Sequence, residues 1–198
     1  MFEQKEYRGE DFSDALILED CLEGMTFVRC RFQDADFARI RMERCRFEHC
    51  AFEGAKFCGA EIRGCAFLNC SFEFADCMSA EFTDCKMTGS DFTNTRLKLI
   101  RIGPGDWSYT VLSGADFSGL QLQEVSFRGA DLTRVNFSKA RLRCDFTTAN
   151  LNGASFREAD LRGSRLQGIN VFEVDWKKAV IDLEQAVTLA WAFGARLG

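Results

Sequence analysis

A strict five-residue period is the feature that most constrains this chain. Large apolar side chains recur at every fifth position from Phe2 to Leu142, and the series resumes from Phe146 to Ile181 after a one-residue slip at 143–145. A period of five matches neither the 3.6 residues of an α-helix nor the two of a strand. It predicts a chain that turns a corner every five residues, so that four corners close a square coil of about 20 residues. The series takes up the 20 phenylalanines except Phe74, Phe172 and Phe193.

A second series, two residues earlier in each repeat, carries mostly small side chains such as Cys30, Ala35 and Ala130. Each repeat therefore buries one large and one small residue and exposes the other three. Successive coils are expected to stack at the strand spacing of about 4.8 Å, with the aromatic rings in columns inside. The repeats suffice for about nine coils, a rod with sides of at most about 16 Å, which is on the scale of duplex DNA.

These repeats resemble those of the pentapeptide-repeat family, whose motif reads A(D/N)LXX or, in Phe-rich members, CXFXX. The motif stands here as Ala130-Asp131-Leu132-Thr133-Arg134 and as Cys45-Arg46-Phe47-Glu48-His49, among other copies. The resemblance extends from Phe2 to about Ile181 and implies an all-β fold, a right-handed quadrilateral parallel β-helix. We expect residues 1–181 to form this β-helix and residues 182–198 to form a short C-terminal α-helix.

The motif weakens at residues 99–110, although the five-residue phase survives. One interpretation is an irregular coil that still packs Trp107 inward. The other is a loop or bulged turn that projects and contacts a partner, because loops on rigid scaffolds often carry binding residues. The candidate contact residues of this segment are Gly103, Pro104, Gly105, Asp106 and Tyr109.

The C-terminal segment has the signals of a capped helix. Asp182 is the expected N-cap, Gln185 occupies the capping-box position, and Gly194 is a plausible stop. Covering the open end of the repeat stack could alone explain this helix. However, it is apolar on more than one side, and in the quinolone-resistance branch of the family such a helix pairs two chains. We therefore expect a homodimer through Leu183, Val187, Trp191, Phe193 and Leu197.

Nothing in the sequence indicates an enzyme, a cofactor or a metal site. His49, the only histidine, falls at an outward position, and most of the ten cysteines fill the small inward position, as small buried hydrophobes do. The formal net charge of −5 argues against direct nucleic-acid binding, and no apolar stretch is long enough to span a membrane. The polar N-terminus lacks the pattern of an export signal, so we expect a cytoplasmic protein with free thiols.

Assigning the outward positions to four sides of the coil reveals an acidic face, on the side whose inward column contains Phe12, Phe32 and Phe52. Only Arg31 and Arg134 oppose its carboxylates, whereas the other three sides are neutral or weakly basic by the same count. The acidity serves either solubility or the binding of a basic partner. The carboxylates of this face are Asp11, Asp14, Asp34, Glu53, Glu73, Asp91, Asp131 and Glu173.

The Phe- and Cys-rich repeats, the length and the terminal apolar helix resemble the family branch that includes Qnr, MfpA and the albicidin-resistance protein AlbG. Members of this branch bind type II topoisomerases, DNA gyrase above all, imitate DNA in shape and charge, and protect the enzyme from inhibitors such as quinolones or albicidin. The resemblance implies that function here, at the basic DNA-binding surface of gyrase. The alternative is a structural or protein-interaction module with a different partner, because fold alone does not give function.

The charge distribution departs from this branch. Residues 1–100 contain 19 acidic and 13 basic residues, whereas residues 101–198 contain 11 and 12. A dimer joined at its C-terminal helices would then have a near-neutral middle, although the acidic region of the relatives is central. We therefore expect contacts by residues 103–109 to act alongside charge mimicry.

Overall fold

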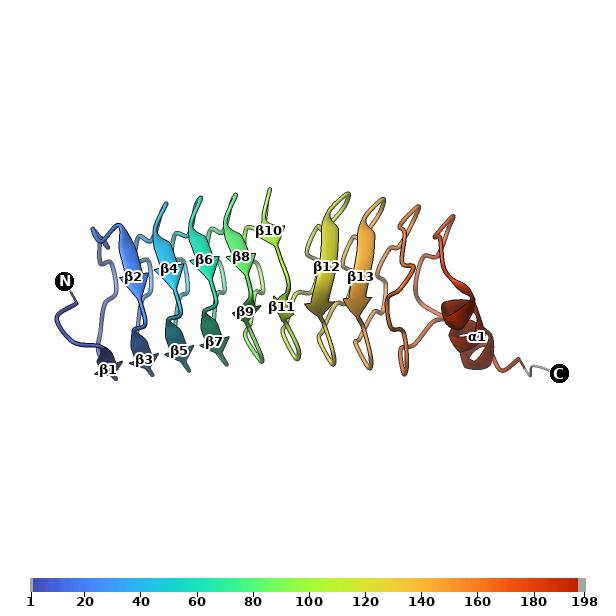
Figure 1. The fold of residues 1–198 in the computed structure, drawn as a ribbon, viewed down its shortest axis with the longest axis horizontal. Helices are drawn as coiled ribbons and strands as arrows, with labels where there is room; N and C mark the ends of the chain where they lie inside the picture. The colour runs from blue at the N-terminus through green and yellow to red at the C-terminus, as the bar shows by residue number, and fades with distance from the viewer. Residues whose placement is uncertain (1, 196–198) are drawn as a thin grey trace. The chain divides into compact units, whose positions relative to one another are not determined.

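A computed structural model describes residues 2–195, which form two compact units, the first ending at Val111 and the second beginning at Leu112. Within each unit the chain winds as a right-handed quadrilateral parallel β-helix, as the repeat predicts (Figure 1). The second unit also contains the helix α1, Leu183–Ala192.

Two of the four sides of the first unit are parallel ladders of short strands. Partners stand one coil apart, as Phe27 pairs with Phe47 and Met42 pairs with Ile62. The first ladder comprises β1 (Glu6–Arg8), β3 (Thr26–Val28), β5 (Arg46–Glu48), β7 (Ala66–Leu68), β9 (Cys85–Lys86) and β11 (Gly105–Asp106). The second comprises β2 (Cys21–Glu23), β4 (Arg41–Glu43), β6 (Glu61–Arg63), β8 (Glu81–Thr83) and β10 (Arg101–Ile102).

The other two sides of the first unit pair through single bridges instead of strands. One series of bridges runs Asp11, Arg31, Ala51, Ser71, Asp91 and Val111, and the other runs Leu16, Asp36, Lys56, Asp76 and Arg96. The backbone N–H of Phe32 donates to the carbonyl of Ala51 in the next coil at 2.7 Å, and that of Ala35 closes the corner on Phe32 at 3.1 Å. Each coil thus satisfies the peptide groups of its neighbours, which burial requires.

The aromatic rings form columns inside the coils. The centroids of Phe32 and Phe52 lie 5.1 Å apart with nearly parallel planes, and the same column continues through Phe72 and Phe92 at 5.0 and 4.7 Å. Rings of adjacent columns meet edge to face, as Phe47 and Phe52 do at 5.4 Å. Both geometries are favourable for aromatic pairs, at about 0.5–1.5 kcal/mol beyond the burial of area.

The corners require a backbone that most residues avoid. The last residue of a repeat usually has a positive φ, for example 69° at Gly54 and 57° at Asp34. Glycine adopts this region without a steric penalty, and Asp and Asn adopt it more readily than other residues. This constraint explains why glycine is the most frequent residue at these corners.

The segment at residues 99–110 stays in the coil, so the projecting-loop interpretation is wrong. Trp107 is fully buried and β11 pairs with β9, while the carbonyl of Pro104 accepts the N–H of Asp84 at 2.7 Å. Gly105 is needed because a Cβ there would lie 2.5 Å from the carbonyl oxygen of Cys85. Thr110 fills the small inward position, and its hydroxyl donates to the carbonyl of Trp107 at 2.7 Å.

The second unit absorbs the one-residue slip in a bulge. Its strands β12 (Gln121–Ser126) and β13 (Arg141–Asp145) pair in parallel, and the register shifts where β12 contains the extra corner residue Glu124, which has φ 58°. Beyond the bulge, Asp131 pairs with Asn150 instead of residue 151. A bulge of this kind lets one coil be shorter than its neighbour without loss of the ladder.

Helix α1 begins with the predicted capping box. The carboxylate of Asp182 accepts the backbone N–H of Gln185 at 3.0 Å, and the Gln185 side chain accepts the N–H of Asp182 in return. Gln185 is buried and donates to the carbonyls of Leu161 and Ser164 in the preceding coil. The helix ends at Ala192, followed by Gly194 at φ 82°. Gln185 therefore caps the open end of the second unit, since its side chain hydrogen-bonds to two carbonyls of the last complete coil.

The packing predicts that Ala130→Leu lowers the melting temperature. Ala130 is fully buried in a small inward position of the second unit, so a larger side chain overpacks the coil at ~1–3 kcal/mol. Thermal unfolding followed by circular dichroism measures the shift. Ser118→Leu, at an exposed outward position, is the control and should unfold near the wild-type temperature. An unchanged melting temperature for Ala130→Leu would contradict the packing.

Candidate functional site

The first unit carries most of the predicted acidic face, on the side of the column Phe12, Phe32, Phe52, Phe72 and Phe92. Every coil of this unit contributes at least one carboxylate, and Arg31 is the one basic residue at the described outward positions of this side up to Val111. The face therefore has a strongly negative potential, because a single cation opposes its carboxylates. Its members are Asp11, Asp14, Asp34, Glu53, Glu73 and Asp91.

Arg31 neutralises only the edge of this face. Its guanidinium donates to the carboxylate of Asp11 at 2.5 Å, and this hydrogen bond holds the pKa of Asp11 well below its ordinary value. Asp14 and Asp34 are exposed at corners, while Glu53 and Glu73 are half-buried along the middle of the face. Asp11 is therefore the one carboxylate of this face in the first unit that forms an ion pair among the described residues.

The carboxylates of Asp34 and Glu53 pack against the surface of the coil. The Asp34 carboxylate lies over Gly54, where a Cβ would collide with it. One carboxylate oxygen of Glu53 is buried and accepts no hydrogen bond from any residue of the described chain. Burial of an unpaired carboxylate oxygen is unfavourable, and a donor from a partner would relieve it.

Phe74 stands on the corner directly after Glu73 and was missed among the candidate residues. It is 63% exposed, although its φ of 58° is a conformation that costs a residue with a Cβ about 1–2 kcal/mol. The equivalent corners of the adjacent coils carry Gly54 and Asn94, which tolerate this backbone. The sequence did contain a signal, since Phe74 is one of the few phenylalanines outside the five-residue series.

In the second unit, considered by itself, the side with the equivalent repeat positions carries only two of the predicted carboxylates, Asp131 and Glu173, which are opposed by Arg134. Partial burial of Asp131 acts to raise its pKa, but hydrogen bonds from Thr133 and Ser113 outweigh this effect and hold the pKa below its ordinary value. The carboxylate of Asp131 is thus already engaged within the protein. The first unit offers the stronger acidic surface.

The predicted contact residues at 103–109 form part of the coil wall. Gly103, Gly105 and Asp106 are half-buried, and Pro104 is exposed. Burial acts to raise the pKa of Asp106, but hydrogen bonds from Ser108 and Thr88 keep it below its ordinary value. Tyr109 is exposed at a corner with φ 59° and offers an accessible aromatic surface. These residues lie in the first unit, on the side of β9 and β11 and the corners that flank it.

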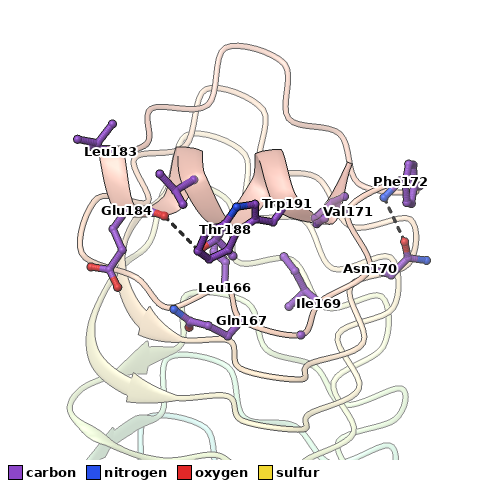
Figure 2. Close-up of a pocket in the computed structure, with 13 residues that line it drawn as sticks. Leu166, Gln167, Ile169, Asn170, Val171, Phe172, Leu183, Glu184, Thr188 and Trp191 are labelled. Atoms are coloured by element: carbon purple, nitrogen blue, oxygen red, sulfur yellow. Dashed lines mark hydrogen bonds between the residues drawn. The ribbon is translucent and has the colours of Figure 1, made fainter. Parts of the chain in front are cut away.

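An apolar groove of about 1150 Å³ lies between α1 and the last coil of the second unit. Figure 2 shows Trp191 and Thr188 on the helix above Leu166 and Ile169 of the coil. Leu183, Trp191 and Phe193 are strongly exposed, Val187 lines the groove half-buried, and Leu197 lies outside the described residues. Exposure of so much apolar surface at one end favours a binding surface.

Most of the cysteines are buried in the β-helix. The cysteines are free, and burial raises the pKa of Cys85 to about 11, so this thiol is protonated at neutral pH. Residues 2–195 contain no cluster of metal-ligating side chains and no helix long enough to cross a membrane. His49 is exposed at a corner with φ 52°.

Comparison with known proteins supports the repeat. The sequence profile of the pentapeptide repeats matches in eight copies, over residues 26–64, 60–98, 110–143 and 143–175. The full-length structure of QnrB1, described as a plasmid-mediated fluoroquinolone resistance protein, has 22% identity, covers 96% of this chain and 99% of its own, and gives a TM-score of 0.77. A trypsin-treated variant of QnrB1 has 23% identity, 97% coverage of both chains and a TM-score of 0.70. No curated protein sequence matches the chain.

Proposed function

Since the chain belongs to the pentapeptide-repeat family, we propose that it binds DNA gyrase and protects this type II topoisomerase from inhibitors such as quinolones or albicidin. The acidic face of the first unit carries the proposal. Support comes from the likeness to QnrB1, a protein described as giving fluoroquinolone resistance. The protein would act in the cytoplasm as a binding protein, without catalysis, cofactor or direct contact with nucleic acid.

The acidic face suits a basic DNA-binding surface in spacing and rigidity. Its carboxylates recur about once per coil at the strand spacing of about 4.8 Å, which is comparable to the roughly 3.4 Å of helix axis for each phosphate of one DNA strand. The β-helix holds them on a rigid wall, so little conformational entropy is lost on binding. Complementary charge of this kind raises the association rate and makes the affinity sensitive to salt.

The distribution of charge favours the first unit as the gyrase-binding part. Asp34, Glu53 and Glu73 form no ion pair within the described chain, whereas Asp131 of the second unit is engaged by neighbouring hydroxyls. Residues 103–109 belong to the same unit and would supply a second contact through Tyr109 and Pro104. The protein would then occupy the DNA-binding surface of gyrase. The inhibitor could not trap a gyrase–DNA complex there, and the enzyme would be protected.

The charge-reversed variant Asp34→Lys, Glu53→Lys, Glu73→Lys tests this proposal. We expect wild-type protein to restore supercoiling by gyrase in the presence of a quinolone, and the triple variant to lose this protection. Its binding to gyrase should weaken by about tenfold or more and become less sensitive to salt, because charge pairs across the interface are lost.

A matched control reverses the same number of charges on another side of the first unit. Glu43→Lys, Glu61→Lys, Glu81→Lys changes β4, β6 and β8, and should keep protection if position matters more than net charge. Wild-type protein that affects gyrase at no concentration, with or without inhibitor, would support the alternative function of an interaction module with another partner.

We also propose that the apolar groove beside α1 pairs two copies of the chain. Leu183, Val187, Trp191 and Phe193 offer apolar surface, and the first three line the groove. A second copy would bury this surface from water, at roughly 25 cal/mol for each Å² removed. Leu197, beyond the described residues, belongs to the same expected interface.

Sedimentation equilibrium at micromolar concentration tests the dimer. We expect twice the chain mass for wild type and for the control Ser118→Glu, which adds a charge outside the groove, and the chain mass for Trp191→Glu. Trp191 is 62% exposed, so the variant should keep its fold. Wild-type protein that sediments as a monomer would exclude this interface.

A further inference from the structure

Phe74 combines three properties that set it apart from the phenylalanines of the core. The residue is 63% exposed, its backbone has φ 58°, and it belongs to neither inward series. The flanking corners in the same column show that Gly and Asn satisfy this position. The packing of the β-helix therefore gives no reason for a phenylalanine here.

On its own side of the coil, Phe74 has acidic neighbours. Glu73 precedes it, Glu53 occupies the equivalent outward position one coil earlier, and Asp34 lies over the adjacent corner Gly54. Arg31, the basic residue of this side, is held by Asp11. The ring thus stands as an isolated apolar projection bordered by carboxylates.

We propose that Phe74 is an apolar anchor that inserts into a socket of the protein partner, a socket whose rim carries arginine or lysine side chains. The inference rests on the proposed function, since it assumes that the acidic face binds a basic protein surface. The partner's cations pair with Glu53 and Glu73 while the ring is removed from water between them. Interfaces commonly concentrate their affinity in a few aromatic residues, surrounded by polar contacts that exclude water.

This anchor also distinguishes a folded protein partner from a short basic peptide or a free cation. Carboxylates alone would attract any basic surface, with an affinity that depends on salt. An apolar socket adds a contact that salt does not screen and that requires matching shape. Phe74 would therefore make binding specific for a partner with a matching socket, whereas the carboxylates would attract basic surfaces in general.

The variant Phe74→Asn tests the anchor, with purified DNA gyrase as the probe. Asn removes the ring and suits the left-handed corner, as Asn94 does at φ 56°, so the melting temperature should stay or rise. The dissociation constant should increase by about tenfold or more, as for a central aromatic contact. The dependence of affinity on salt should remain that of wild type, because no charge is removed.

Leu99→Asn is the matched control. Leu99 is 68% exposed at a corner with φ 60°, but it stands on a different side of the first unit, after Lys98. Its variant should bind gyrase as wild type does. If both variants weakened gyrase binding equally, the loss would come from removing any exposed apolar corner residue, and the proposed anchor would be overturned.

The outcomes separate this inference from the function on which it rests. Wild-type affinity for Phe74→Asn, together with lost affinity in the Asp34, Glu53 and Glu73 charge reversal, would overturn the anchor and leave the acidic face as the binding surface. Absence of binding by wild-type protein would overturn both. Weakened binding with an unchanged salt dependence and an undiminished melting temperature would support the anchor.

Discussion

The rest of the structure depends on how little room the square coil leaves inside. Each side of a coil admits one large and one small side chain, so Phe52 packs beside small neighbours such as Cys50 and Ala55, both buried. Rings one coil apart then meet at 4.6 Å for Phe47 and Phe67 and at 5.1 Å for Phe32 and Phe52. Because the interior is fixed in this way, the three outward positions in every repeat can vary without a change in the core, with only the corner restricted by its backbone.

That freedom accounts for the acidic face and for Phe74. The carboxylates of Asp34, Glu53 and Glu73 make no contribution to the core, and the corner of Phe74 would be satisfied by Gly or Asn. Residues that a fold neither needs nor favours are reasonable candidates for binding. Helix α1 contains residues of both kinds. Buried Gln185 is needed to cap the β-helix, whereas exposed Trp191 lines the apolar groove.

Much of the fold could be predicted, because the five-residue period, the helix cap and the glycine stop are all set by residues close together in the sequence. The columns through Phe32, Phe52 and Phe72, the box of Asp182 and Gln185, and the stop at Gly194 all follow from spacing. The close backbone approaches and polar contacts between coils could not be predicted. The glycines at 103 and 105 suggested a loop, but Gly105 instead allows close approach to the Cys85 carbonyl, and the slip became a bulge at Glu124. The buried oxygen of Glu53 and the carbonyl partners of Gln185 likewise depend on three-dimensional packing.

The central claim is that the fivefold period stacks aromatic rings one coil apart, and ring-to-ring nuclear Overhauser effects test it most directly. With phenylalanine rings selectively labelled, the stacked arrangement predicts cross-peaks between Phe32 and Phe52 and between Phe52 and Phe72, whose centroids are 5.1 and 5.0 Å apart. It predicts none between Phe32 and Phe72, which are separated by two strand spacings, about 10 Å. Absence of the first two cross-peaks in folded protein would contradict the columns, and with them the face on which the proposed function depends.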